Sequence, residues 1–282
     1  MNMRRIVVSL GVLLFACGPL AAQRSGRAQA PVNPADIADW HGKTVMLFSP
    51  HPDDDLSAAG TMARLVRNGN KVIIVMYTTG NKGTHDVEMT GERLAEIRRN
   101  EDLAANKIIG IAPENIIWLG YDDGMLEYVP PKELLEKVCR LVRQFRPDAI
   151  FSIDPGSPYT KWIKTDHRMS AFITVDGARA AAFPLYFPSQ RINEGLEQFT
   201  IRDFFFWSTE QPTVKVDITD VAELKLRAAT QHASQYGKGN IKYAGPVMDP
   251  EGVEIMRARF MRKDADGKIY ERFRRLQESL SF

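Results

Sequence analysis

Two short clusters of histidine and aspartate carry the strongest chemical signal in this sequence. The first, Pro50-His51-Pro52-Asp53-Asp54-Asp55, follows the apolar run Val45–Phe48 and precedes a helical pattern at residues 56–68. His51 and Asp54 are three residues apart, so one ion can reach both side chains. Zinc and other divalent metals favour this mixture of imidazole and carboxylate ligands. Asp53 lies between the two and can act on whatever the metal binds.

The second cluster is Asp166-His167. A long loop separates it from an apolar run at residues 149–153. The first cluster alone has an ordinary explanation, because Pro, Asp and Ser are common in turns and Asp is a good helix N-cap. Two such clusters, each beyond an apolar strand, favour a metal site over a solvated turn.

The elements that would position these clusters alternate between strands and helices. We expect strands at residues 45–48, 71–77, 116–119 and 149–153, and helices at 56–68, 92–109, 131–145 and from about 167 to 182. This alternation predicts an α/β fold with a mostly parallel sheet and right-handed crossovers. Open sheets of this kind place ligands at the carboxyl ends of their strands, where both clusters lie.

The C-terminal half shows weaker patterns. Residues 204–207 and 214–217 are expected to form short strands, 219–236 a helix, and the charged tail 251–280 further helix. No GxGxxG motif follows the first strand, so the fingerprint of a dinucleotide-binding fold is missing.

The first 22 residues are typical of a secretory signal peptide. Arg4 and Arg5 precede an apolar run of 11 residues, and Leu20-Ala21-Ala22 offers a cleavage site before Gln23. The run is too short to span a bilayer, so we expect an exported chain with no transmembrane span when mature. An uncleaved N-terminal anchor and lipidation at Cys17 are the alternatives. Residues 23–43 are expected to be a linker, and 44–282 a single domain.

The composition of the chain limits the kinds of molecule that it is expected to bind. The chain has 282 residues, 44% of them hydrophobic, which is enough for a sizeable core. Its net charge of +2 falls to 0 once the two arginines of residues 1–22 are removed, so nothing indicates binding to nucleic acid. Cleavage leaves Cys139 as the single cysteine, which excludes an internal disulfide and a cysteine zinc site.

Pro50-His51-Pro52-Asp53-Asp54 and Asp166-His167-Arg168 together resemble the PIG-L/LmbE-like family of zinc-dependent N-acetylglucosaminyl deacetylases. Three further segments are similar to the family in the same order: Gly91-Glu92-Arg93 with Glu96, Gly120–Met125 and Lys225–Gln235. The resemblance implies a Rossmann-like three-layer fold with one catalytic domain. It also implies one Zn²⁺ held by His51, Asp54 and His167, with Asp53 as general base.

The chemistry of the residues agrees with this assignment. Three protein ligands leave an open position for water, which is the pattern of catalytic rather than structural zinc. A carboxylate beside the metal can take a proton from water and return it to a leaving amine. We expect Asp166 to orient a ligand. Arg93 and Asp122 are candidates for holding sugar hydroxyls, and the alternative is that they are ordinary helix-end and turn residues.

Two positions depart from the family pattern. Asp55 stands where the family usually has Glu, and we expect little consequence because either residue favours a helix N-terminus. Lys164 stands where the family often has a histidine, three residues before the last zinc ligand. A lysine cation can stabilise an oxyanion as that histidine is thought to do. His232 is a second candidate for polarising the carbonyl.

The leading hypothesis is therefore a periplasmic or extracellular zinc hydrolase that deacetylates an N-acetylglucosamine-type sugar or glycoconjugate. One alternative is a metal-containing sugar-binding protein with lost or altered catalysis, for which Lys164 is the best support. Retention of Asp53 argues against it, because binding alone needs no base. Another is a non-haem iron site built on the same two histidines and carboxylate.

Overall fold

A single sheet forms the centre of the fold, and its strands β2, β3, β4, β5 and β6 coincide with apolar runs of the sequence. The computed structural model describes residues 32–156 and 165–278, so the predicted signal peptide, Cys17 and Lys164 lie outside the described residues. Within these ranges eight strands pair in the order β1-β7-β8-β6-β5-β2-β3-β4. Every pair is parallel except those of β8, which confirms the predicted α/β fold with a mostly parallel sheet.

The element boundaries lie close to those expected. The strands are β1 Asn33–Pro34, β2 Thr44–Ser49, β3 Lys71–Thr78, β4 Ile116–Tyr121, β5 Ala149–Ile153, β6 Phe204–Trp207, β7 Val214–Asp217 and β8 Tyr270–Leu276. The helices are α1 Ala59–Arg67, α2 Gly91–Ile108, α3 Pro131–Phe145, α4 Thr165–Ala181, α5 Pro188–Ile192, α6 Ala222–Ala229 and α7 Pro250–Phe260.

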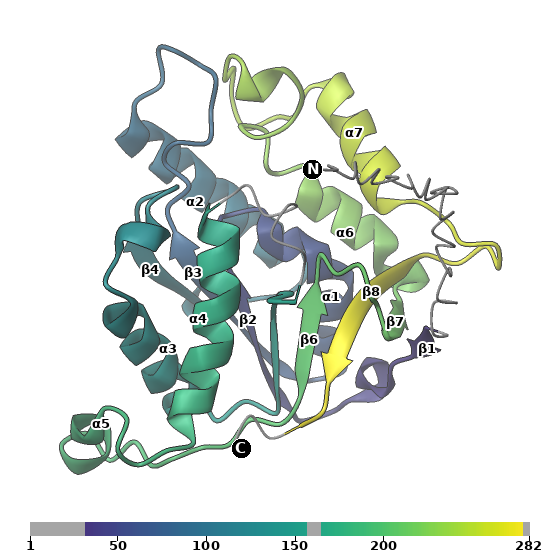
Figure 1. Cartoon of the computed structure of the whole chain (residues 1–282). Coiled ribbons are helices and arrows are strands. Elements are labelled where there is room, and N and C mark those ends of the chain that lie inside the picture. The colour runs from purple at the N-terminus through teal and green to yellow at the C-terminus, as the bar shows by residue number, and fades with distance from the viewer. Residues whose placement is uncertain (1–31, 157–164, 279–282) are drawn as a thin grey trace, which may run out of the picture. The chain divides into compact units, whose positions relative to one another are not determined.

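Strand β2 shows why the sheet needs helices on both faces. Successive strand residues point to opposite faces. Val45 and Leu47 join one hydrophobic cluster, Met46 and Phe48 join the other, and all four are fully buried. Burying each side chain contributes about 1.5–3 kcal/mol. Residues of α1, α2 and α6 fill the first cluster, and residues of α3 fill the second. Figure 1 shows α3 and α4 together in front of the strands.

The strand order reverses beside β2. The chain runs from β2 to β3 and β4 on one side, then returns to place β5 on the other side of β2. The carboxyl ends of β2 and β5 therefore meet at a topological switch point, where open α/β sheets bind ligands. The two histidine–aspartate clusters follow these two strands, so the fold brings them together.

The prediction of a helical tail at residues 251–280 is wrong for its last part. Helix α7 forms, but residues 270–276 form β8, which pairs antiparallel with both β6 and β7. Glu271 and Phe273 point inward and are buried while Arg272 between them is exposed, an alternation typical of a strand. The predicted helix at 219–236 is also shorter, because α6 ends at Ala229.

Buried Glu271 explains how β8 is held in the fold. Its carboxylate accepts hydrogen bonds from the backbone amides of Gly60 and Thr61, at 2.8 and 2.7 Å, at the start of α1. It also accepts from Lys225 Nζ of α6 at 2.5 Å. A carboxylate at a helix N-terminus satisfies unpaired amides and offsets the helix dipole, so this one side chain joins β8, α1 and α6.

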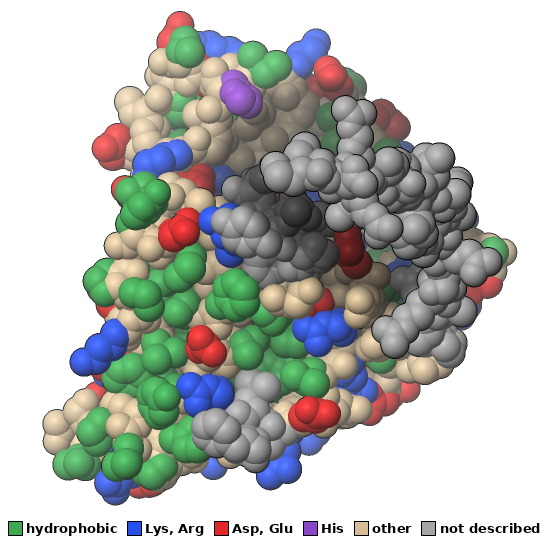
Figure 2. All heavy atoms as spheres, in the orientation of Figure 1, with side chains coloured by type: hydrophobic (Ala, Val, Ile, Leu, Met, Phe, Trp, Pro, Cys, Tyr) green, Lys and Arg blue, Asp and Glu red, His purple; other side chains and the backbone are tan. Residues whose placement is uncertain are grey.

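The molecular surface is uneven in character. Figure 2 shows hydrophobic side chains gathered over the side of the molecule that carries α3, α4 and α5. Exposed hydrophobic residues here include Phe172 of α4, Ile192 of α5 and Leu185 in the connection between these two helices. None of the helices in the described ranges combines the length and the apolar composition that a membrane span requires.

Candidate active site

The turn after β2 holds its polar residues in a strained but well-supported conformation. The hydroxyl groups of Ser49 and Thr78 donate to the carbonyl oxygens of His51 and Pro50, at 2.9 and 2.8 Å. Asp53 has a φ of +142°, a value that costs a non-glycine residue about 1–3 kcal/mol. Strain of this size persists where the surroundings fix the chain, and it is common at active sites.

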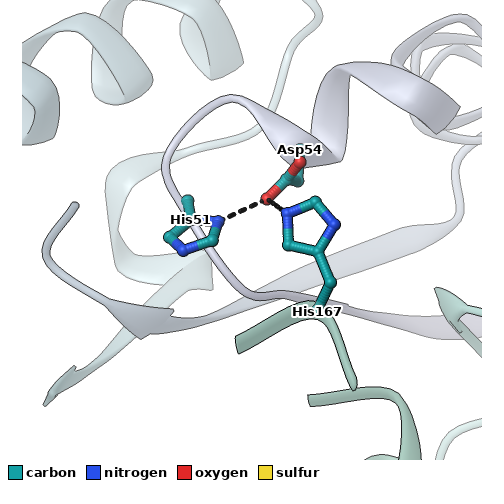
Figure 3. Close-up of side chains that lie close together, drawn as sticks. All are labelled: His51, Asp54 and His167. Atoms are coloured by element: carbon teal, nitrogen blue, oxygen red, sulfur yellow. Dashed lines mark hydrogen bonds and ion pairs between the residues drawn. The ribbon is translucent and has the colours of Figure 1, made fainter. Parts of the chain in front are cut away.

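His51, Asp54 and His167 converge on one point (Figure 3). Asp54 Oδ2 lies 2.8 Å from His51 Nδ1 and 3.2 Å from His167 Nε2. His167 Nε2 is a buried atom that makes no hydrogen bond among the described residues, although it faces this carboxylate. Two imidazole nitrogens and a carboxylate oxygen directed at a common centre form a ligand set that suits a divalent metal. The residues present therefore fit zinc.

The second nitrogen of His51 is held by acids from two other segments. Nε2 lies 3.1 Å from both Asp166 Oδ2 and Asp123 Oδ1. Asp166 also accepts from the backbone amides of Gly124, at 2.6 Å, and Leu126, at 3.0 Å. An imidazole that binds metal through Nδ1 keeps its proton on Nε2 and donates it to a carboxylate. This geometry fits the predicted role of Asp166 as a group that orients a ligand.

His51, Asp123 and Asp166 also form a group whose ligand atoms lie close together. We favour the set with Asp54 and His167, because Asp166 already accepts two backbone hydrogen bonds. A metal at both groups would also require His51 to lose both ring protons.

The histidines and carboxylates of this region shift one another's pKa values. Burial would lower the pKa of His51, but hydrogen bonds to Asp123, Asp166 and Asp54 outweigh it and raise that pKa well above its usual value. Burial would raise the pKa of Asp54, but His167 and His51 hold it well below its usual range. In the same way His51 lowers the pKa of Asp123 to about 2, against the effect of burial. The acids are thus ionised and available to a cation at neutral pH.

Both carboxylate oxygens of Asp53 accept hydrogen bonds. Arg98 Nη2 donates to Asp53 Oδ1 at 3.1 Å, and the Tyr236 hydroxyl donates to Oδ2 at 3.2 Å. Arg98 is buried, and it also donates to the carbonyl oxygens of Pro52, at 2.8 Å, and Gly80, at 3.1 Å. One guanidinium therefore ties the turn after β2 to the loop after β3 and fixes the carboxylate beside the metal ligands.

Two adjoining cavities open onto Asp53. One, of about 420 Å³, is also lined by His51, Arg98 and Asp123. The other, of about 460 Å³, is also lined by Asp54, His85, His167, Tyr236 and Arg259. The candidate metal ligands and the Asp53 carboxylate thus face space of the size that small-molecule sites occupy.

Comparisons with known proteins agree with this geometry. A family model described as PIG-L, GlcNAc-PI de-N-acetylase, matches residues 46–178. The diacetylchitobiose deacetylase of Thermococcus kodakarensis is 33% identical over 195 residues, which cover 69% of this chain and 70% of that protein. The chain belongs to the PIG-L family. The suspected resemblance to these deacetylases is therefore confirmed.

Solved structures support the same fold for this PIG-L protein. N,N'-diacetylchitobiose deacetylase from Pyrococcus horikoshii, complexed with its inhibitor MPG, has a TM-score of 0.70 and 28% identity, covering 86% of this chain and 89% of that one. GalB, the 4-carboxy-2-hydroxymuconate hydratase from Pseudomonas putida KT2440, has a TM-score of 0.62 at 20% identity, covering 85% and 98%. GalB shares the fold alone, and the fold does not determine the reaction, so activity has to be argued from the site.

The remaining predicted site residues lie at varied distances from the centre of this PIG-L site. Arg93 is exposed at the start of α2. Asp122 is exposed and contacts Asn81 and Lys82, at 2.9 and 3.3 Å. Neither lines the two cavities, so sugar binding by these two side chains stays a prediction.

His232 is completely buried, and neither of its nitrogens has a hydrogen-bond partner among the described residues. Burial, helped by the nearby Arg98, lowers its pKa to about 3, so the ring is neutral. It lines neither cavity at the site. Its proposed role at the carbonyl therefore stays a prediction, as does that of Lys164, outside the described residues.

Asp55 lies in the first turn of a short 3-10 helix, Asp54–Ala58, as its expected position at a helix N-terminus predicts, but its side chain is buried. It turns into the interior, where its Oδ2 accepts from Asn106 Nδ2 at 3.2 Å. Burial raises its pKa to about 7. The substitution of Asp for the usual Glu thus lies in a buried contact with α2.

Sequence reasoning missed Arg98, Asp123 and Tyr236. Arg98 had a detectable signal, because it lies on the same buried helical stripe as Leu94 and Ala105, where a charged residue needs a partner. Asp123 is adjacent to the predicted Asp122, and only the conformation of the loop decides between them. Tyr236 directly follows a segment that resembles the family.

Proposed function

We propose that this protein is a zinc-dependent hydrolase that removes acetyl from an N-acetylglucosamine-type sugar or glycoconjugate. The observation that carries the proposal is the convergence of His51, Asp54 and His167 with Asp53 beside them, facing the cavities. The named activities of the relatives point to the same chemistry, since two of them are diacetylchitobiose deacetylases.

The chemistry divides between the metal ligands and Asp53. When bound, zinc polarises a carbonyl oxygen and lowers the pKa of a water molecule towards neutrality. His51, Asp54 and His167 hold the ion, and Asp166 keeps the His51 ring in the tautomer that leaves Nδ1 free. Asp53 accepts the proton of the attacking water and returns it to the amine as the amide bond breaks.

Asp53 is suited to this work by its neighbours. Arg98 and Tyr236 hold its two oxygens in place, so the carboxylate needs no rearrangement before it accepts a proton. Negative charge on the carbonyl oxygen needs a second donor beside the metal, which is worth about 2.7–4 kcal/mol. Lys164 and His232 are the two candidates that we propose for this donor.

An acetate-release assay tests the proposal. The full chain is stripped of metal with a chelator, then assayed on N,N'-diacetylchitobiose, N-acetylglucosamine and N-acetylated glycoconjugates, with and without added zinc. We expect release of acetate and of a free amine that depends on zinc. Sugar binding by the zinc-loaded protein without any release of acetate would instead support a sugar-binding protein that has lost catalysis.

We further propose that the protein is exported and that its mature chain begins near Gln23. The support is the basic start, apolar run and small-residue site of residues 1–22. N-terminal sequencing of protein from its native host tests this. A mature chain that begins at Cys17 with an acyl group would identify a lipoprotein.

A further inference from the structure

A third cavity, of about 500 Å³, lies at the same edge of the sheet as the active site. It is bounded by the end of β7, the start of β8 and the end of α7, where the chain leaves α7 and turns back into the sheet (Figure 1). Both β6 and β7 pair antiparallel with β8, so β7 runs parallel to the main strands. Its carboxyl end therefore faces the edge where sheets of this kind bind ligands.

The charged side chains that line this cavity are mostly cations: Lys225, Arg259, Arg262, Lys263 and Arg272, with Asp264 as the acid among them. We call it the basic cavity. Two of its cations are neutralised, because Lys225 pairs with Glu271 at 2.5 Å and Arg272 pairs with Asp264.

Three cations of the basic cavity have no acidic partner among the described residues. They are Arg259, Arg262 and Lys263, all three exposed, and Arg259 contacts the Tyr236 hydroxyl and the Phe260 ring instead. Guanidinium groups bind phosphate and carboxylate through paired hydrogen bonds, and an ammonium adds a compact charge. Because the cavity concentrates positive charge in a recess, it attracts anions more strongly than scattered surface cations do.

The basic cavity adjoins the active site at one side chain. Arg259 lines both the basic cavity and the cavity that contains Asp54 and His167. Its Nη1 donates to the Tyr236 hydroxyl at 3.3 Å, and that hydroxyl donates to Asp53. Because Arg259 borders both cavities, the basic cavity lies next to the space where a substrate acetamide at the candidate metal ligands would lie.

We propose that the basic cavity binds an anionic group, a phosphate, sulfate or carboxylate, that the substrate carries beyond its N-acetylated sugar. This inference rests on the proposed deacetylase function and narrows its substrate class to anionic glycoconjugates. The anion provides binding energy away from the reacting amide, so its effect is on the capture of substrate.

Matched substrates test the proposal. N,N'-diacetylchitobiose is compared with the same disaccharide carrying a terminal phosphate or a terminal carboxylate, and kcat/KM is measured for each at low and high salt. We expect the zinc-loaded protein to prefer the anionic substrates by about tenfold at low salt, and less at high salt, where surface charges are screened. The phosphate and carboxylate arms distinguish which anion the cavity prefers.

The variant Arg262→Ala/Lys263→Ala removes two exposed cations from the basic cavity. In this variant kcat/KM for the anionic substrates should fall nearly to the value for the neutral disaccharide. The value for the neutral disaccharide itself should not change. The matched control is Lys107→Ala/Arg191→Ala, which removes one exposed lysine from α2 and one exposed arginine from α5, neither of which lines the basic cavity or the two cavities of the active site. It should retain the preference.

Calorimetric titration with inorganic phosphate examines the cavity without turnover. We expect binding to the parent protein and to the control, and at least tenfold weaker binding to Arg262→Ala/Lys263→Ala. Deacetylation of the neutral and anionic substrates at equal kcat/KM would overturn the inference and leave the proposed function standing. Phosphate binding that depends on Arg262 and Lys263 in a protein that deacetylates nothing would support the anion site and refute the deacetylase.

Discussion

Asp53→Asn separates the chemistry of the active site from its architecture. Arg98 Nη2 lies 3.1 Å from Asp53 Oδ1, and the Tyr236 hydroxyl lies 3.2 Å from Oδ2. An asparagine has nearly the same shape. Its carbonyl oxygen can accept from Arg98, and its amide can donate to the tyrosine oxygen. The variant thus keeps both contacts and loses only the charge and the ability to take a proton.

The expected loss of activity follows from this role. A general base typically contributes about 10²–10⁴-fold to the rate, so kcat should fall by that factor. KM should change little, because the metal ligands are untouched and asparagine keeps the shape of the cavity wall at this position. Stability should also fall, since buried Arg98 loses the nearer of its two anionic partners and keeps Asp123, at 3.9 Å. The loss should be about 3 kcal/mol or less, because Arg98 keeps the carbonyl oxygens of Pro52 and Gly80.

Three measurements on the full chain decide the matter: kcat and KM for N,N'-diacetylchitobiose, bound zinc by elemental analysis, and the thermal unfolding midpoint. Full zinc content with kcat lowered at least a hundredfold is the expected result. A kcat within threefold of the parent protein would refute the assignment. Asp123 would then be the next candidate, because it lines the cavity while Asp55 is buried against Asn106.

The other predictions concern the metal, the oxyanion, the alignment of the base and the buried acids. His167→Ala should sharply lower bound zinc, and full occupancy in that variant would remove His167 from the site. Lys164→Met should lower kcat by roughly 10²-fold with zinc retained, while Lys164→His keeps substantial activity; equal turnover in all three proteins would show that the lysine is only a surface charge. Tyr236→Phe should lower kcat about tenfold, since one hydrogen bond to the charged Asp53 is worth about 1.5 kcal/mol. KM and zinc content should not change. An unchanged kcat would show that Arg98 alone aligns the base. Burial raises the pKa of Glu101 from 4.5 to about 7, so between these values the folded state holds a proton that the unfolded state has lost, and stability should fall as pH rises through this window. Glu101→Gln should reduce that fall, as measured by denaturant unfolding at pH 5 and pH 8, and an identical pH dependence would place its origin in other groups.

Local patterns were enough to predict the parallel part of the sheet. Runs such as Lys71–Tyr77 are apolar on both faces because helices cover both faces of the strand, so the prediction needed no knowledge of partners. Strand β8 could not be found in this way. Its buried Glu271 is stabilised by Gly60, Thr61 and Lys225, which are distant in the chain, and a buried acid breaks the apolar pattern on which such predictions depend.

The residues of the site also divide into those that local sequence patterns predict and those that depend on the folded conformation. His51, Asp54 and His167 were predictable because they follow apolar strands whose carboxyl ends must share one edge of the sheet. The choice between Arg93 and Arg98 depended on helical phase, since Arg98 lies on the buried stripe of α2 and Arg93 does not. The choice between Asp122 and its neighbour depended on loop conformation, which residue types alone leave open.

The position of Glu271 has a consequence for how the protein is made. The carboxylate that stabilises the start of α1 is 211 residues further along the chain than Gly60, whose amide it accepts. Helix α1 follows the turn that carries His51, Asp53 and Asp54. The start of this helix therefore gains its Glu271 contact only after β8 has been synthesised. A translation product that stops before β8 contains every ligand that we assign to the metal. It nevertheless lacks the side chain that secures the helix behind them, so a strand far along the chain completes the support of a turn near its beginning.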